Sequence, residues 1–563
     1  VYRYHFARTR PPFRASTDKE SVSPEIAGYR TDPLSTARNR AGFALKNASA
    51  LYPNVILFGI DSMSRSNFIR QLPRTYEYLT KTLNAVEMLG YTKVWDNTFA
   101  NLMAIFAGKF VGYGDQFKRE LHESEPMFYD NWTDYLWQRY SKAGYATFFA
   151  DDSAATAMFN YYAARDRGFR RQPTDFYARP FWLAQQHTIV RLRSSHDCYN
   201  TKGDHKVLTE WLFDFLASYR HERKWAFLWS NGLSHEFLNT VGVADGDFLR
   251  FFESSHELLR ENTIMFVFSD HGHRFDAIRK TIIGRLEVRM PFMVVHLSDD
   301  LRKSHPKLYA NLRHNAHRLT TPFNVFGTLN GILEQNWSNN ANDNGALAKN
   351  GTTGGRKVSR KTREDFEKRS LSLLTERLPD DRTCEQAFIP ADYCPCSHEV
   401  SLPTTDATST NLAAVLVAEL NAQLQSIETR RKIAQNLKRQ KHRRKASPGT
   451  RSKHYYRYEC AVYKLSHILS VTAFLPNRAT LRDTTQRETN GLLVNYRLQI
   501  EVSPNGAVFE GLLSFDYSSG VIKQTGDVNR NNAYGNTSWC IANDRTRRKL
   551  CYCQPLVAAA VAS

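Results

Sequence analysis

Apolar runs that stop abruptly at polar residues mark the first two thirds of the chain. They include residues 55–60 (VILFGI), 225–229 (WAFLW) and 264–268 (IMFVF). Short unbroken runs are typical of parallel strands that helices cover on both faces. Amphipathic stretches such as residues 135–143 separate the runs. The pattern therefore predicts a doubly wound α/β domain over residues 51–335, with a mostly parallel sheet and helices on both faces.

Two of these runs end in side chains that can bind a cation. The run that starts at residue 55 leads into Asp61, and the run that starts at residue 264 leads into Asp270 and His271. Open parallel sheets place their ligand sites beyond the carboxyl ends of the strands. Carboxylate and imidazole groups that meet in such a crevice suit a divalent cation.

A third polar position lies between these two, in the sequence DNTFANL. Asn97 and Thr98 precede an apolar, helix-forming run, which predicts a helix start with the Thr98 hydroxyl at its positive end. A metal-bound hydroxyl beside unpaired backbone N–H groups can attack a phosphoryl or sulfuryl group, whose charge the N–H groups stabilise. Thr98 is therefore the candidate nucleophile.

The motifs NVILFGIDS, DNTFANL and FSDHGHRF, in this order and spacing, resemble the alkaline phosphatase and sulfatase superfamily. More narrowly, the chain resembles a secreted animal family known as domain of unknown function 229. The resemblance implies an alkaline phosphatase-like fold over roughly residues 50–335 and a metal site of Asp61, Thr98, Asp270 and His271. TFANL is similar to the TFPN motif of the nucleotide pyrophosphatase and phosphodiesterase branch, whose Thr is the nucleophile, with Ala100 replacing Pro.

The second metal site of two-metal relatives is changed in this chain. The resemblance implies an Asp, a His four residues later and a further His, but Asn231 stands at the Asp position ahead of His235. The segment TTPFNVF has Asn324 and Phe326 where related sequences look like TTPFDIH. His235 and Asn231 thus remain candidate ligands of a second ion, and His235 can alternatively stabilise the departing oxygen.

One ion is favoured over two by these departures. Phosphoglycerol transferases of the superfamily resemble this chain in placing a carboxylate, a Thr, an Asp and a His around one metal, and the donor set suits Zn, Mn, Mg or Ca. Typical sulfatases match less well, because the sequence at Thr98 lacks their C/S-x-P-x-R motif.

Composition divides the rest of the chain. Residues 1–50 are polar and Arg-rich and predict an N-terminal arm. Residues 336–383 begin with an Asn-, Gly- and Lys-rich stretch and predict a linker or extended surface loop. Residues 384–563 predict a smaller Cys-rich α+β domain, with a helix near 412–427 and strands near 493–502 and 507–515.

Cysteine placement favours an oxidising compartment. Only one of the eight cysteines, Cys198, lies in the catalytic-type domain; the tail holds Cys384, Cys394, Cys396, Cys460, Cys540, Cys551 and Cys553. Two C-x-C pairs in a small domain indicate disulfides and hence an extracellular or secretory-lumen location. A zinc-binding tail is the alternative, although the usual C-x-x-C spacing is missing.

Other sequence features agree with secretion without requiring it. Glycosylation sequons occur at Asn47, Asn131, Asn336, Asn350 and Asn536. No stretch approaches the roughly 20 apolar residues of a membrane span. The sequence starts at Val1 with no visible signal-peptide core, so a mature form, an ectodomain or an incomplete chain are all open.

The formal net charge is +20, and residues 430–457 contain twelve Lys or Arg without an acidic residue. The simplest interpretation is a solvated helix end and loop. The alternative is a binding stripe for a polyanionic glycan. Nucleic acid is not expected, because no nucleic-acid-binding module is present.

Two functions follow from these observations. The first is a secreted or lumenal metal-dependent hydrolase or transferase acting on a phosphate or sulfate ester, with Thr98 as nucleophile. The alternative is a catalytically impaired protein of the same fold that binds an anionic glycan or a protein partner, motivated by Asn231, Asn324 and Phe326.

Overall fold

The structure is a computed structural model that describes residues 52–112, 117–120, 129–131, 134–154, 158–159, 168–186, 188–334, 368–396, 398–443, 458–475, 493–525, 527–532, 535–541, 544 and 547–555. The chain forms two compact units. The first comprises described residues within 1–112, 119–273 and 286–395. The second comprises those within 113–118, 274–285 and 396–563.

The first unit is built on a seven-stranded sheet of order β2-β9-β8-β1-β7-β3-β4. The five strands from β8 to β4 run parallel, while β9 is antiparallel to β8 and β2 is antiparallel to β9. The mostly parallel sheet predicted from the apolar runs is thus confirmed. The strands are β1 (Asn54–Ile60), β2 (Val86–Glu87), β3 (Ala146–Asp151), β4 (Phe176–Tyr177), β7 (Lys224–Ser230), β8 (Thr263–Phe268) and β9 (Met293–Leu297).

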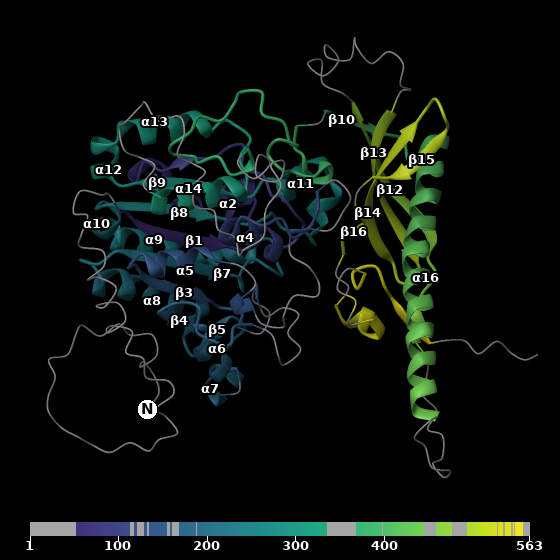
Figure 1. Cartoon of the computed structure of the whole chain (residues 1–563), viewed down its shortest axis with the longest axis horizontal. Helices are drawn as coiled ribbons and strands as arrows, with labels where there is room; N and C mark the ends of the chain where they lie inside the picture. The colour runs from purple at the N-terminus through teal and green to yellow at the C-terminus, as the bar shows by residue number, and fades with distance from the viewer. Residues whose placement is uncertain are drawn as a thin grey trace, which may run out of the picture. The chain divides into compact units, whose positions relative to one another are not determined.

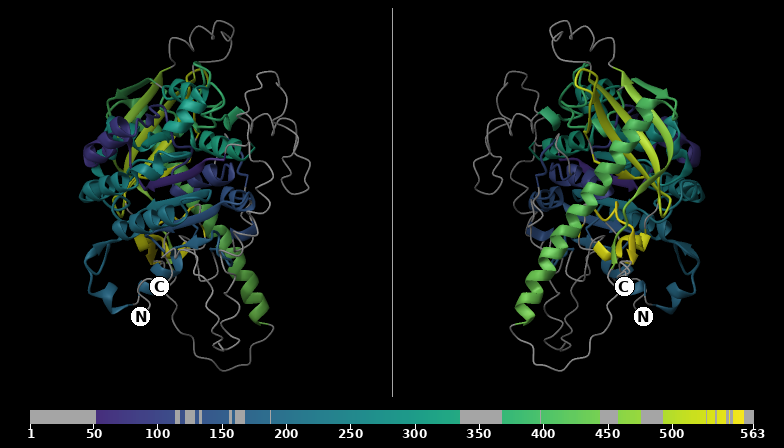
Figure 2. Two further views of the ribbon diagram at one scale, coloured as in Figure 1. Left: turned by 90° about the vertical axis from the view of Figure 1, so that its left-hand side faces the viewer. Right: turned by 90° about the vertical axis from the view of Figure 1, so that its right-hand side faces the viewer.

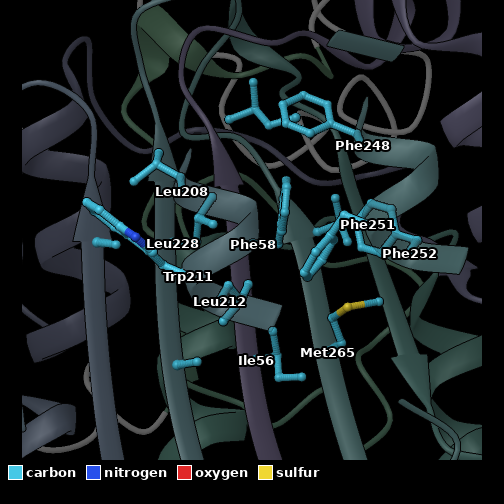
Figure 3. Packing of buried hydrophobic residues seen from close by; sticks show 14 of the residues in the cluster. Ile56, Phe58, Leu208, Trp211, Leu212, Leu228, Phe248, Phe251, Phe252 and Met265 are labelled. Atoms are coloured by element: carbon cyan, nitrogen blue, oxygen red, sulfur yellow. The ribbon is translucent and has the colours of Figure 1, made fainter. Parts of the chain in front are cut away.

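One face of this sheet is covered by α8 (Asp204–Ser218) and α9 (Asp245–Ser254). Every second strand residue points to this face, and the helices fill it with leucine and aromatic side chains (Figure 3). The residues labelled in the figure are Ile56, Phe58, Leu228 and Met265 from the strands, Leu208, Trp211 and Leu212 from α8, and Phe248, Phe251 and Phe252 from α9.

The opposite face is covered by α4 (Thr98–Ala107), α5 (Leu136–Lys142) and α14 (Pro322–Glu334). The ring of Phe106 on α4 lies 4.6 Å from that of Phe227 on β7, and Tyr140 on α5 lies 6.1 Å from Trp225. Helices therefore flank the sheet on both sides (Figure 1), which confirms the doubly wound α/β class.

Shorter elements complete the first unit. They are α2 (Arg65–Gln71), α3 (Pro73–Glu77), η2 (Tyr78–Thr82), η3 (Tyr129–Asn131), α6 (Arg179–Gln185), α7 (Ile189–Leu192), β5 (Cys198–Tyr199), β6 (Lys202–Gly203), η4 (Thr240–Ala244), α10 (His256–Leu259), α12 (Asp299–Ser304), α13 (Pro306–Asn315) and η6 (Ala391–Tyr393). Helix α11 (Ile282–Arg289) begins in the second unit and ends in the first.

Residues 368–383 are not a linker, contrary to the sequence prediction. Arg369, Leu373, Leu374 and Leu378 are buried in the first unit. The Arg369 guanidinium binds Glu120 at 2.8 Å and lies 4.4 Å from the centre of the Phe323 ring. Because this segment carries its own apolar residues, it packs into the first unit, and the boundary lies between residues 395 and 396 rather than before Cys384.

The second unit is α+β, as predicted. Its antiparallel sheet has the order β10-β12-β13-β14-β15, with β16 also paired to β14. Helix α16 (Ala407–Arg443), longer than predicted, runs along this sheet (Figure 2) and buries Leu412, Leu416 and Leu420 against it. The other elements are η5 (Ala277–Lys280), β10 (His398–Leu402), β11 (Tyr458–Cys460), β12 (Lys464–Leu475), β13 (Leu493–Ser503), β14 (Ala507–Asp516), β15 (Val521–Gln524), β16 (Asn529–Arg530), η8 (Gly535–Ile541) and β17 (Cys553–Pro555).

Three disulfides join six of the eight cysteines. Cys384–Cys394 lies in the first unit, and Cys460–Cys551 and Cys540–Cys553 lie in the second. Cys198 and Cys396 remain thiols. The pairing favours the disulfide interpretation of the tail over the zinc-binding one.

Several predicted features lie outside the described residues. These are the N-terminal arm 1–50, most of the expected linker, the loop at residues 444–457 and the sequons at Asn47, Asn336 and Asn350. Within the described part of the chain, no helix combines the length and apolar character needed to cross a bilayer.

Candidate metal centre

Three side chains from two adjacent strands converge beyond the carboxyl end of the sheet. Asp61 follows β1, while Asp270 and His271 follow β8, its parallel neighbour. Each offers one ligand atom, and these atoms lie within 4.8 Å of one another. All three side chains are buried, with exposed fractions of 1% or less. The predicted core of the metal site is therefore assembled by the order of the strands.

The turn after β1 fixes the position of Asp61. The Ser62 hydroxyl donates to Asp61 Oδ1 at 2.9 Å, and the Ser62 N–H donates to Asp270 Oδ1 at 3.2 Å. Ser62 has a φ of 58°, a left-handed conformation that costs a non-glycine residue about 1 kcal/mol or more. This strained residue is the one that hydrogen-bonds to both Asp61 and Asp270.

The turn after β8 orients the imidazole of His271. Its Nδ1 lies 3.0 Å from the Gly272 carbonyl oxygen, so Nδ1 carries the proton and donates to that oxygen. The unprotonated Nε2 lies 3.1 Å from Asp270 Oδ2 and 3.4 Å from Thr98 Oγ1, so its lone pair faces the other site residues. Gly272 permits the turn because a Cβ there would lie 2.3 Å from the Glu287 carbonyl oxygen.

Thr98 reaches the same point from the first residue of α4. The Asn97 side chain caps this helix by accepting a hydrogen bond from the Ala100 N–H at 3.1 Å. The N–H groups of Thr98 and Phe99 are first-turn donors at the positive end of the helix. The predicted helix start is confirmed, and it presents a hydroxyl and an anion-stabilising environment to the cluster.

Asn101 is a site residue that the sequence did not single out. Its Oδ1 accepts from the N–H groups of Val94 and Trp95 at 2.9 and 3.1 Å. Its Nδ2 donates to the carbonyl oxygens of Trp95 and Asn97 at 2.9 and 3.1 Å. Asn101 is fully buried, so it ties the segment that leads into Thr98 to the first turn of α4.

The charge balance of the cluster fits a cation. Burial, followed by repulsion from Asp61, raises the pKa of Asp270 to about 8, against hydrogen bonds that lower it. Two buried carboxylates facing an imidazole lone pair repel one another unless a proton or a positive ion lies among them. The residues present therefore suit a divalent cation held by Asp61, Asp270, His271 and the Thr98 hydroxyl.

Of the second predicted ligand pair, His235 is not in this cluster of His and carboxylate ligand atoms. Asn231 and His235 lie on the turn after β7, and the described His, Cys, Asp and Glu residues form no further metal-sized group there. His235 Nδ1 lies 2.7 Å from Glu236 Oε1, and about a third of the His235 side chain is exposed, at 32%. The backbone N–H of Asn231 donates to Asp152 Oδ1 at 2.8 Å.

Asn324 and Phe326, the two positions on α14 that differ from the motif implied by the resemblance, have structural contacts. Asn324 Oδ1 accepts from the Thr321 N–H at 3.0 Å and from Arg382 Nη1 at 2.9 Å, and its Nδ2 donates to the Leu371 carbonyl oxygen at 2.8 Å. The buried Phe326 ring lies against Gly108, where a Cβ would approach it to 2.7 Å. Neither side chain is placed to hold an ion.

Asp151, which is buried, and Asp152, which is partly buried, are acidic residues that the sequence prediction did not include. Asp151 is the last residue of β3, the strand beside β7, and Asp152 follows it, in the same apolar-then-acidic pattern that marks Asp61. Burial raises the pKa of Asp151 to about 6 and that of Asp152 to about 8. An apolar run that ends in acidic residues is the sequence signal that could have identified them. With these two residues, polar side chains follow four neighbouring strands of the sheet, β8, β1, β7 and β3.

The fold and the cluster define a doubly wound α/β protein with a candidate metal centre at the carboxyl edge of its parallel strands. The chain belongs to the family described as "Protein of unknown function (DUF229)", which matches residues 15–443. A comparison with curated proteins gave no match.

Three bacterial proteins are among the solved structures to which the chain is similar. One is a protein in the alkaline phosphatase superfamily from Vibrio parahaemolyticus, with 10% identity, a TM-score of 0.36 and coverage of 92% of this chain and 95% of that chain. Another is a phosphonate monoester hydrolase from Silicibacter pomeroyi, with 11% identity, a TM-score of 0.38 and coverage of 83% of this chain and 89% of that chain. The third is the soluble domain of a lipooligosaccharide phosphoethanolamine transferase from Neisseria meningitidis, with 14% identity, a TM-score of 0.33 and coverage of 51% of this chain and 89% of that chain.

Proposed function

We propose that this protein is a metal-dependent hydrolase or transferase that acts on a phosphate or sulfate ester, with Thr98 as the nucleophile. The observation that supports it is the convergence of the Thr98 hydroxyl, the His271 imidazole and two buried carboxylates at the positive end of α4. A bound divalent cation would lower the pKa of a hydroxyl and polarise an ester oxygen.

The residues of the chain have distinct roles in this proposal. Asp61, Asp270 and His271 would hold the ion, and Ser62 and the Gly272 carbonyl hold those side chains in place. The Thr98 oxygen loses its proton and forms a bond to phosphorus or sulfur, while the bond to the leaving oxygen breaks and that oxygen takes up a proton. Water, or an acceptor hydroxyl in a transferase, then displaces Thr98 from the transferred group. The N–H groups at the start of α4 stabilise the charge that develops on the transferred group.

One ion is sufficient for this proposal. Asn324 and Phe326 are committed to packing, and Asn231 lacks the charge of the expected Asp. His235, partly exposed on the turn after β7, stays a predicted contact to a leaving oxygen or a second ion. Zn, Mn, Mg and Ca all suit the oxygen-rich set.

A binding protein is the second candidate function. The same departures at Asn231, Asn324 and Phe326 motivate it, since a lost second ion removes much of a two-metal mechanism. An anionic glycan would be bound through residues 430–457, whose side chains lie outside the described residues. For both candidates we propose a secreted or lumenal location, which the three disulfides support.

The proposal is tested with protein purified from a secretory host. Bound metal is measured first, and turnover of aryl phosphate, phosphodiester and sulfate esters is then compared between wild type, Thr98→Ala and the matched control Thr209→Ala. Thr209 is a buried threonine on α8, whose hydroxyl donates within its own helix. We expect metal-dependent turnover that Thr98→Ala lowers at least about 1,000-fold and Thr209→Ala leaves within about threefold.

One result would decide against the enzyme, and another against its proposed nucleophile. Bound metal with no turnover of any ester would favour the binding protein. Turnover that survives Thr98→Ala would remove Thr98 as the nucleophile.

A further inference from the structure

A disulfide-closed loop packs against the segment that leads into Thr98. The Cys384–Cys394 disulfide closes this loop, and Tyr393, its last residue before Cys394, is buried with 2% exposure. The Tyr393 ring lies 4.6 Å from Lys93 Nζ and meets the Trp95 ring edge-on, with 5.6 Å between centroids. All of these residues belong to the first unit.

Lys93 links Tyr393 to Asp96 through its buried ammonium group. Its side chain is fully buried, at 0% exposure, and its ammonium lies 3.3 Å from Asp96 Oδ1. A buried ammonium is stable only beside compensating groups, and a carboxylate together with an aromatic face provides them. Tyr393 therefore helps to hold both Lys93 and, through it, Asp96, which is two residues from Thr98.

The segment 93–97 is held from two sides. On one side, Asn101 binds backbone groups of Val94, Trp95 and Asn97. On the other side, Tyr393 contacts the side chains of Lys93 and Trp95. Asn101 lies inside α4, whereas Tyr393 comes from almost 300 residues away in sequence and is kept in place by the disulfide.

We propose that Tyr393 is a positioning residue for the Thr98 nucleophile and that the Cys384–Cys394 loop keeps it in place. The inference rests on the proposed function, because it needs Thr98 to react. Asp61, Asp270 and His271 are fixed by β1, β8 and their turns, so loss of the Tyr393 contact displaces the nucleophile and leaves these three ligands in place.

Three changes test this role by the turnover of the preferred ester. Tyr393→Ala removes the ring, and we expect kcat to fall about 10- to 100-fold, since a displacement near 1 Å costs about this much. Tyr393→Phe keeps the ring and is expected to restore kcat to within about threefold. KM and the metal dissociation constant should change less than about threefold in both variants.

Disulfide variants provide a second measurement. Cys384→Ser with Cys394→Ser should lower kcat like Tyr393→Ala, whereas Cys460→Ser with Cys551→Ser opens a disulfide of the second unit and should leave kcat unchanged. Leu212→Ala, in the core under α8, serves as a control for general destabilisation and should not change kcat of the folded protein.

The outcomes separate this inference from the proposed function. If Thr98→Ala abolishes turnover and folded Tyr393→Ala keeps the wild-type kcat, the positioning role is wrong and the proposed function stands. A fall in kcat that Tyr393→Phe does not restore also overturns it. If Thr98→Ala retains turnover, the proposed function fails before Tyr393 is considered.

Discussion

Replacement of one buried carboxyl group is predicted to stabilise the metal-free protein near neutral pH and to weaken its response to metal. The change is Asp270→Asn, which keeps the shape of a side chain that is 0% exposed. In the metal-free protein, burial and the neighbouring Asp61 raise the pKa of Asp270 from 3.8 to about 8. The carboxylate thus opposes folding unless a proton or a cation compensates it.

The sign and size follow from proton linkage. Between pH 3.8 and about 8 the folded protein holds a proton on Asp270 that the unfolded chain has lost. The free energy of unfolding therefore falls as pH rises, by about 1.4 kcal/mol per pH unit. From pH 5.5 to pH 7.5, this one group lowers the stability of the metal-free wild type by roughly 3 kcal/mol, a loss that Asp270→Asn lacks.

Urea unfolding in the presence of a chelator measures this difference. Tryptophan fluorescence reports mainly the first unit, because Trp539 is the only one of the nine tryptophans after residue 337. Glu210→Gln, which breaks an exposed ion pair with Lys202, is the control and should keep the wild-type pH dependence. A divalent ion at 100 times its dissociation constant should stabilise the wild type by about 2.7 kcal/mol and Asp270→Asn far less.

The reasoning is refuted if wild type and Asp270→Asn lose stability equally between pH 5.5 and pH 7.5. Asp152, whose pKa is also raised to about 8, contributes a loss of the same sign in both proteins. The comparison therefore concerns the difference between the two slopes. Equal stabilisation of both proteins by the metal would remove Asp270 from the ligand set.

Three further predictions concern the surroundings of the site. Phe326→His, which introduces the histidine that the resemblance implies at this position, should cost about 2–4 kcal/mol in urea unfolding and add no second ion by metal analysis, because the ring packs on Gly108. Gly272→Ala should weaken metal binding at least about tenfold by calorimetry, since its Cβ would clash with the Glu287 carbonyl. Asn101→Ala should lower stability by about 2–4 kcal/mol, and unchanged unfolding would contradict its bridging role.

The sequence alone determined the strands and the positions of the candidate ligands. An apolar run that ends in Asp61 or Asp270 records a buried strand and its polar end, and this information is local. The helix start at Thr98 was equally local, because a cap and an apolar run suffice to indicate it. The same local pattern occurs at Asp151, at the end of β3.

Only the tertiary structure decided which of these ends meet. Asp61 and Asp270 are neighbours because β1 pairs with β8, and strand order depends on contacts between distant segments. The packing roles of Asn324 and Phe326 likewise depend on partners that no local pattern encodes. The contact of Tyr393 with Lys93 has the same origin, since burial and charge pairing are properties of the folded chain.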